Sequence, residues 1–299
     1  MPAAAPLDPA EWVAAFGRAA DAVAGGLRHA RDGDDARAGL AEETGERGAG
    51  GDRTLVIDAD AEDAVFAELE RLHEDGARFS ALSEERGRVD FGGTDALVVI
   101  DPIDGSTNAK RGVAHHAVSL ALATGPDVVT RGTMADVTCG LVLDLGSGVR
   151  HDAIRGGGAR RDGRPLRGPA TERRSDDGRI ELVAIESADP RNLVAAGPAL
   201  VQHAHRVRAI GAMALSLCWV ADGRVDAMAS LWRCRAIDVA AGQLIVRESG
   251  GHVAFGTDAE GDLLAAPLDL EPHLPISAAR TPEGLLRAMA LPAVADARS

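Results

Sequence analysis

The chain has 299 residues, 45% hydrophobic and 26% charged, which is long enough for one large domain or two smaller ones with a substantial core. Its 46 acidic residues outnumber the 32 basic ones and give a net charge of −14. This balance argues against a nucleic-acid backbone or an anionic membrane as the main partner. The three cysteines lack paired spacing, and neither a signal peptide nor a bilayer-length apolar segment is visible. We therefore expect a cytoplasmic protein with reduced thiols.

The first half of the sequence predicts alternating helices and strands. A helix is predicted from Asp8 to about Arg31, because apolar residues recur there at steps of three and four. The segment 32–51 is rich in Gly, Asp and Glu, has no such period, and is predicted to be a solvated loop. The other predicted elements are a helix after Asp58, a hairpin turn at 161–164, and strands over 54–57, 79–82, 96–100, 117–124, 128–133 and 140–145.

The polar segment 171–178 is the candidate boundary between an N-terminal part, residues 1–177, and a C-terminal part, residues 178–299. The glycines at 156–158 are interpreted as a plain loop rather than a phosphate-binding nest, because no strand-to-helix pattern surrounds them. The predicted elements beyond the boundary are strands over 180–185, 207–210, 225–229 and 252–255, helices over 190–205, 212–221 and 237–249, and a strand and helix within 276–288. The pattern predicts layers of sheets and helices.

An acidic turn follows the apolar run Ala96–Ile100. It reads Asp101-Pro102-Ile103-Asp104-Gly105-Ser106-Thr107-Asn108 and places two carboxylates three residues apart. Proline ends the strand pairing, and glycine permits an unusual backbone turn. Two acids beside a buried strand need a cation, and carboxylate oxygens are the ligands that Mg²⁺ and Ca²⁺ take. An EF-hand loop does not fit, because Ile103 and Gly105 would fill two of its ligand positions.

Three further acids stand at predicted element ends: Asp58, Glu84 and Asp238. Each has an ordinary alternative role, since a lone Asp at such a place caps a helix more often than it catalyses, and Glu84 beside Glu85 fits a surface pair. Only the combination of these acids with the turn at 101–108 indicates a site that holds metal ions.

The chain resembles the inositol monophosphatase superfamily. The motifs that carry the resemblance are Ser83-Glu84-Glu85, Asp101–Asn108 and Ile237-Asp238-Val-Ala-Ala-Gly242 with Glu248-Ser-Gly-Gly251, and they lie within residues 54–279. Asn108–Gly112 and Arg206–Gly211 resemble most the bifunctional inositol monophosphatase/fructose-1,6-bisphosphatase branch. The resemblance implies an α+β fold, a layered α/β/α/β/α sandwich, and a homodimer. It also implies Mg²⁺-dependent hydrolysis of a phosphate monoester, with two or three ions in each active site.

Residue roles follow from the matched motifs. The resemblance implies that Glu84, Asp101 and the carbonyl of Ile103 hold one metal, and that Asp101 bridges to a second, which Asp104 and Asp238 also hold. It implies a catalytic set of Asp58, Glu84 and Ser106, in which Asp58 and the Ser106 hydroxyl orient the attacking water. Backbone N–H groups at the start of a helix can bind a phosphate oxygen. The candidate substrate-binding residues are Gly105, Ser106, Gly211, Ala212, Arg233 and Arg235.

The leaving alcohol is not fixed by these motifs. Inositol-selective relatives carry an acid seven residues before the last metal-binding Asp, and here that position is Leu231. Arg233 and Arg235 could instead bind a second phosphate, and surface or structural roles for them are equally open. We expect inositol-1-phosphate or fructose-1,6-bisphosphate as the small phosphorylated substrate. Histidinol phosphate or 3′-phosphoadenosine phosphate is the alternative, and a metal- and phosphate-binding regulatory protein without turnover is the rival class.

Overall fold

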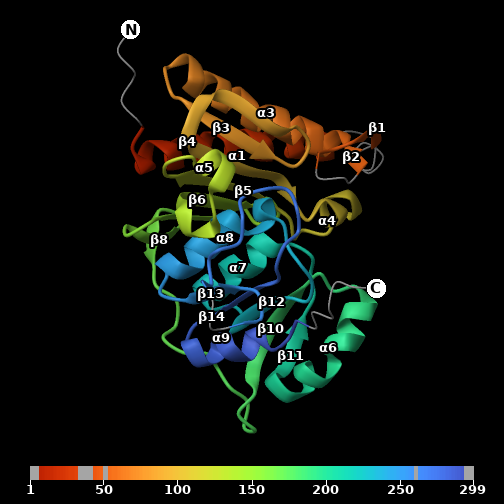
Figure 1. The fold of residues 1–299 in the computed structure, drawn as a ribbon. Helices are drawn as coiled ribbons and strands as arrows, with labels where there is room; N and C mark the ends of the chain where they lie inside the picture. Colours follow the sequence, from red (N-terminus) through yellow and green to blue (C-terminus); the bar gives the residue numbers. More distant parts are fainter. Residues whose placement is uncertain (1–6, 33–42, 50–52, 259–261, 293–299) are drawn as a thin grey trace.

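A computed structural model describes residues 7–32, 43–49, 53–258 and 262–292. Helices and sheets alternate through the molecule as α/β/α/β/α layers, which confirms the predicted fold (Figure 1). None of the helices in the described part of the chain is both long and apolar enough to cross a membrane.

A seven-stranded sheet forms the first β layer, in the order β3-β4-β5-β6-β7-β8-β9. Its strands from β4 onward pair antiparallel with their neighbours, and residues 97–100 of β4 run parallel to β3. The strands are β3 (Phe79–Ser83), β4 (Gly87–Asp104), β5 (Ala117–Thr124), β6 (Val137–Asp144), β7 (Arg150–Ile154), β8 (Gly158–Arg161) and β9 (Arg164–Leu166). The turn between β8 and β9 confirms the hairpin predicted at 161–164.

A five-stranded sheet forms the second β layer, in the order β11-β10-β12-β14-β13. Strand β10 is parallel to both of its neighbours, whereas β14 is antiparallel to β12 and β13. The strands are β10 (Ile180–Glu186), β11 (Ala204–Arg208), β12 (Ala227–Ser230), β13 (His252–Phe255) and β14 (Ile276–Ala279). The segment 171–178 connects the two sheets, and the division into residues 1–177 and 178–299 remains a prediction.

Helices cover the outer faces of both sheets and fill the space between them (Figure 1). The outer helices on the seven-stranded sheet are α1 (Pro9–Asp32) and α3 (Val56–Glu74), whose apolar faces pack on the sheet. The middle layer is α7 (Met213–Asp222) and α8 (Ala236–Glu248), buried between the sheets. The far layer is α6 (Pro190–His203) and α9 (Pro282–Met289). The short helices are α4 (Ser106–Arg111), α5 (Val128–Arg131) and the 3₁₀ helix η1 (Met134–Asp136).

Several sequence predictions are wrong in the described residues, including the one that Pro102 ends the strand pairing, because β4 bulges there and Asp104 pairs with Ala117. The strand expected over 54–57 is β2 (Arg53–Leu55), and α3 begins at Val56, so that Asp58 lies in the first turn of a helix. The segment 128–133 begins with the short helix α5 instead of a strand. A short apolar run is compatible with either a strand or a single helical turn, so the sequence pattern does not distinguish them. Within the predicted loop 32–51, β1 (Glu43–Arg47) pairs with β2, and residues 33–42, 50 and 51 lie outside the described residues.

Candidate active site

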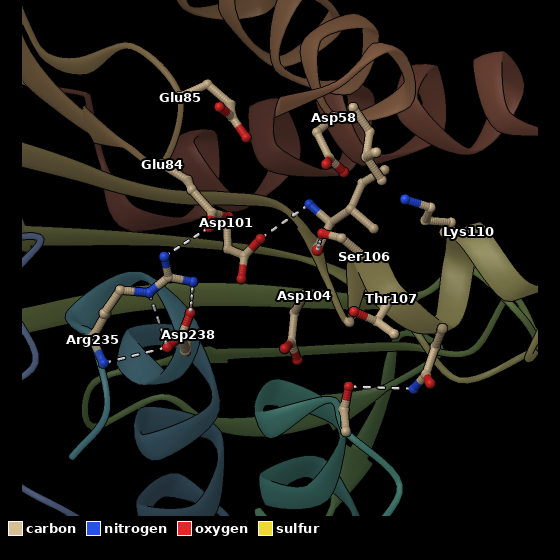
Figure 2. A pocket seen from close by; sticks show the side chains of 15 residues that line it. Asp58, Glu84, Glu85, Asp101, Asp104, Ser106, Thr107, Lys110, Arg235 and Asp238 are labelled. Atoms are coloured by element: carbon tan, nitrogen blue, oxygen red, sulfur yellow. Dashed lines mark hydrogen bonds and ion pairs between the residues drawn. The ribbon is translucent and has the colours of Figure 1, made fainter. Parts of the chain in front are cut away.

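A cavity of about 520 Å³ lies where the end of β4, the start of α4, the first turns of α3 and α8, and the loop before α7 meet (Figure 2). All five acids predicted to form the site line it, although they come from distant parts of the chain. The lining residues are Leu55, Asp58, Glu84, Glu85, Asp101, Ile103, Asp104, Gly105, Ser106, Thr107, Asn108, Lys110, Gly211, Arg235 and Asp238.

The acidic turn is held by its own side chains. Asp101 lies within the buried part of β4, residues 97–104, and its Oδ1 accepts a hydrogen bond from the backbone N–H of Ile103 at 3.0 Å. The Ser106 hydroxyl donates to the carbonyl oxygen of Ile103 at 2.9 Å. The turn therefore brings the carboxylates of Asp101 and Asp104, the backbone of Ile103 and the side chain of Ser106 to the same cavity (Figure 2).

Glycine is required at position 105, where the backbone has a φ of 90°. A β-carbon at this position would lie 2.9 Å from the carbonyl oxygen of Gly211 and 3.1 Å from that of His115. The side chain of Asn108 also holds the turn against these two segments. Its amide donates to the carbonyl oxygens of His115 at 2.8 Å and of Ile210 at 2.7 Å. The acidic turn and the loop before α7 are thereby locked together.

We expect Gly105→Ala to lower the free energy of unfolding of the chelator-treated protein by about 2 kcal/mol or more, because left-handed strain and a backbone clash add. Gly112→Ala is the matched control, since Gly112 has a φ of 71° but nothing within 4 Å of its β-carbon position. It should show the strain alone, about 1 kcal/mol. Urea denaturation of both variants measures the difference, and equal losses would contradict the close packing described for Gly105.

Helix N-termini position two of the acids. Both oxygens of Asp104 accept backbone N–H groups at the start of α7, from Met213 at 3.1 Å and from Ala214 at 2.7 Å. Asp238 occupies the first turn of α8, as predicted, and its Oδ2 accepts the backbone N–H of Arg235 at 3.3 Å. The N-terminal turns of the two helices therefore fix the positions of these carboxylates.

Burial, and after it the charge of neighbouring carboxylates, raises the pKa values of Asp58, Glu84, Asp101 and Asp104. Burial, together with the charge of Glu85, raises the pKa of Asp58 to about 7, although the ammonium of Lys110 opposes the shift. Burial also raises the pKa of Glu84 to about 7, against the opposing charge of Arg235. The pKa values of Asp101 and Asp104 lie well above the usual range for the same reason, burial first and neighbouring carboxylates second. Such a cluster indicates a functional site that a cation completes.

Arg235 lies among these acids rather than at the rim of the cavity (Figure 2). Its Nη1 is 2.7 Å from Oε1 of Glu84, and its Nη2 is 3.2 Å from Oδ1 of Asp238. The guanidinium thus bridges an acid that follows β3 and an acid at the start of α8. The prediction that Arg235 lines the substrate site is compatible with this position, but its contacts are with the predicted metal ligands.

The donor set fits a hard divalent cation in its chemistry, because every candidate ligand is a carboxylate or carbonyl oxygen. The orphaned Oδ1 of Asp58, buried without a hydrogen-bond partner in the protein atoms described, is a further acceptor at the cavity. Among the residues that the structure describes, no three acidic, His or Cys side chains converge closely enough on one point to hold an ion. Metal binding at these residues would therefore require side chains to move.

The remaining candidate residues lie at different distances from the cavity. Gly211 lines it, whereas Ala212 is the buried residue before α7 and Arg233 lies outside the lining, over the ring of Trp232 at 5.7 Å. Leu231 is fully buried in the core beneath the five-stranded sheet. Gly156 and Gly158 donate their backbone N–H groups to the carboxylate of Glu248 at 3.0 Å each, which supports the plain-loop interpretation.

Sequence reasoning missed two charged residues that line the cavity, Glu85 and Lys110. Lys110 is the only lysine in the chain. Figure 2 shows its amino group directed toward the side of the cavity formed by Asp58 and Ser106. The signal that could have identified it is its place on α4, one turn beyond Ser106 and Thr107.

Residues 10–294 match the family model described as the inositol monophosphatase family. The chain belongs to this family. It is 32% identical over 215 residues to an inositol-1-monophosphatase of Mesorhizobium japonicum, with 68% of this chain and 72% of that protein covered. It is 31% identical over 220 residues to a fructose-1,6-bisphosphatase/inositol-1-monophosphatase of Methanothermobacter thermautotrophicus, with 71% and 75% covered. The resemblance predicted from the motifs is confirmed.

Other proteins that are similar to this chain carry a different name. A Nus factor SuhB of Pseudomonas aeruginosa is 32% identical over 253 residues, with 77% of this chain and 86% of that protein covered. Among solved structures, the extragenic suppressor protein suhB of Bartonella henselae aligns with a TM-score of 0.74 at 23% identity over 94% of this chain and 98% of that one. The prediction that nucleic acid is not a partner finds no support in these names.

Proposed function

We propose that the protein is a Mg²⁺-dependent phosphomonoesterase that hydrolyses a small sugar or cyclitol phosphate, inositol-1-phosphate or fructose-1,6-bisphosphate. The observation that carries the proposal is the meeting of Asp58, Glu84, Asp101, Asp104 and Asp238 in one cavity beside the start of α4. Membership of the inositol monophosphatase family supports phosphatase chemistry. The names of the relatives support both substrates without choosing between them.

Glu84, Asp101, the carbonyl of Ile103, Asp104 and Asp238 would hold two or three Mg²⁺ ions. When bound, Mg²⁺ lowers the pKa of water and neutralises charge on the phosphate. Asp58, whose pKa is about 7, is suited to accept a proton from the attacking water at neutral pH, and the Ser106 hydroxyl would orient that water. Glu84, on the other side of Asp101, would contribute to the attack of water on the phosphate as one of the residues that hold the metal.

The first turn of α4 is suited to hold the phosphate. The first hydrogen bonds within α4 are donated by Asn108 and Ala109 to the carbonyl of Gly105, at 2.8 and 3.0 Å. The N–H groups of Ser106 and Thr107 precede these bonds and line the cavity, so a phosphate oxygen can accept them. Lys110 adds positive charge on the same side, which favours an anionic substrate.

The residues of the site support hydrolysis of a phosphate monoester, but they do not identify the alcohol that the reaction releases. The buried Leu231 offers no carboxylate to sugar hydroxyls, which argues against strict inositol specificity. Histidinol phosphate and 3′-phosphoadenosine phosphate therefore remain in the set of candidate substrates. A homodimer and a cytoplasmic location remain predictions.

A panel of phosphate esters tests this proposal. Phosphate release from inositol-1-phosphate, fructose-1,6-bisphosphate, histidinol phosphate and 3′-phosphoadenosine phosphate is measured with Mg²⁺ and again with excess chelator. We expect release from at least one of the first two, only with Mg²⁺, and none from a phosphodiester control. Release from the nucleotide alone would move the assignment to the alternative substrate, and no release from any ester would favour a binding protein without turnover.

A further inference from the structure

The guanidinium of Arg235 is placed where it contacts two of the proposed metal ligands at once. It is 2.7 Å from Glu84 and 3.2 Å from Asp238, and only 20% of its side chain is exposed. Its Nε lies 3.5 Å from the second oxygen of Asp238. A metal ion would need the same carboxylate oxygens. A carboxylate that accepts hydrogen bonds from a guanidinium has fewer lone pairs free to bind a metal.

These contacts join separate parts of the fold. Glu84 follows β3 on the seven-stranded sheet, whereas Arg235 and Asp238 surround the start of α8 in the middle layer. Asp101, 1% exposed, lies close enough to feel the charge of Glu84 and to act with its own charge on Arg235. The guanidinium therefore lies between Glu84 and Asp238 and beside Asp101, at one side of the acidic cluster (Figure 2).

One guanidinium offsets only part of the negative charge that gathers here. Glu84, Asp101, Asp104 and Asp238 carry four formal charges when ionised, and Arg235 supplies one positive charge. A buried carboxylate without a partner is costly, so the arginine stabilises the cluster in the absence of metal. Divalent ions supply more charge at the same oxygens and would displace the guanidinium once their concentration is high enough.

We propose that Arg235 is an internal competitor of Mg²⁺: its guanidinium holds Glu84 and Asp238 in the metal-free protein and must leave them before the metal site closes. The inference rests on the proposed metal-dependent function and adds a residue that sets the metal concentration at which the enzyme becomes active. It also accounts for the lack of a convergent ligand set among the described side chains, since the arginine keeps Glu84 and Asp238 paired to itself.

Calorimetric titration of Mg²⁺ into chelator-treated protein, without substrate, tests the proposal. We expect Arg235→Gln to bind Mg²⁺ about tenfold more tightly than the wild type, because the metal no longer has to break two ion pairs. Arg235→Lys keeps the charge but loses the fork, and should lie between the two. Circular dichroism confirms that each variant is folded.

Arg233→Gln is the matched control, since it removes the same charge two residues away. Arg233 stacks on Trp232 and makes no ion pair within the described residues. Equal gains in Mg²⁺ affinity for Arg233→Gln and Arg235→Gln would show that the loss of one positive charge near the site explains the effect. That result would overturn the proposal. Unchanged or weaker affinity in Arg235→Gln, while the wild type still binds Mg²⁺, would overturn it and leave the proposed function standing. If neither protein binds Mg²⁺, both fail.

Discussion

Replacing Asp101 by asparagine is expected to lower Mg²⁺-dependent phosphate release by about 10³-fold, because a catalytic metal supplies several kcal/mol of transition-state stabilisation. Asn keeps an oxygen that can accept the N–H of Ile103, so the acidic turn should persist. It removes a buried charge that Glu84, Asp104 and Asp238 repel. The metal-free variant should therefore be at least as stable as the wild type at pH 8.

Two measurements separate this expectation from simple misfolding. The melting temperature of the wild type should rise with Mg²⁺, whereas that of Asp101→Asn should hardly change. Asp60→Asn, which removes an exposed acid of α3 outside the cavity, should keep both the activity and the Mg²⁺-induced rise. An Asp101→Asn variant with near-normal turnover would contradict the assignment of Asp101 as a metal ligand.

The stability advantage of Asp58→Asn over the wild type, both treated with chelator, is expected to grow by about 2 kcal/mol between pH 5 and pH 8. Burial raises the pKa of Asp58 in the folded protein to about 7, from 3.8. Between these values the folded wild type keeps a proton that the unfolded chain has lost. This contribution to stability is fully present below about pH 4 and is lost as the pH rises through 7, whereas Asn has no proton to lose.

Urea denaturation of both proteins across this pH range gives the difference directly, and the titration of histidines largely cancels in it. Asp21→Asn is a suitable control, because Asp21 is exposed on α1 and pairs with Arg150 at the surface. Its stability relative to the wild type should stay nearly constant with pH. A difference for Asp58→Asn that is flat or falls with pH would show that Asp58 is ionised in the folded metal-free protein.

Much of the fold was predictable because apolar periodicity follows burial. Residues 97–100 of the apolar run are buried between α3 and α8, and the run is uninterrupted for that reason. The start of α3 was misplaced because Val56 and Ile57 are β-branched and apolar, which favours a strand locally, whereas packing against α1 selects the helix.

The candidate site was predictable at the motif level but not in its contacts. The acidic turn indicates a metal site only in combination with Asp58, Glu84 and Asp238, and the family motifs then imply the role of each acid. No local pattern reports that Arg235 reaches Glu84, because that contact joins residues 151 positions apart in different layers. For the same reason the place of Lys110 beside Asp58 became visible only in three dimensions (Figure 2).

The central claim is that these acids serve Mg²⁺-dependent hydrolysis of a phosphate monoester. The most direct measurement is phosphate release from inositol-1-phosphate and fructose-1,6-bisphosphate by chelator-treated wild-type protein as Mg²⁺ is added back. The account predicts no release at first and then a rise to saturation with Mg²⁺ for at least one of the two substrates. Release that is equally fast in excess chelator, or absent at every Mg²⁺ concentration, would contradict it.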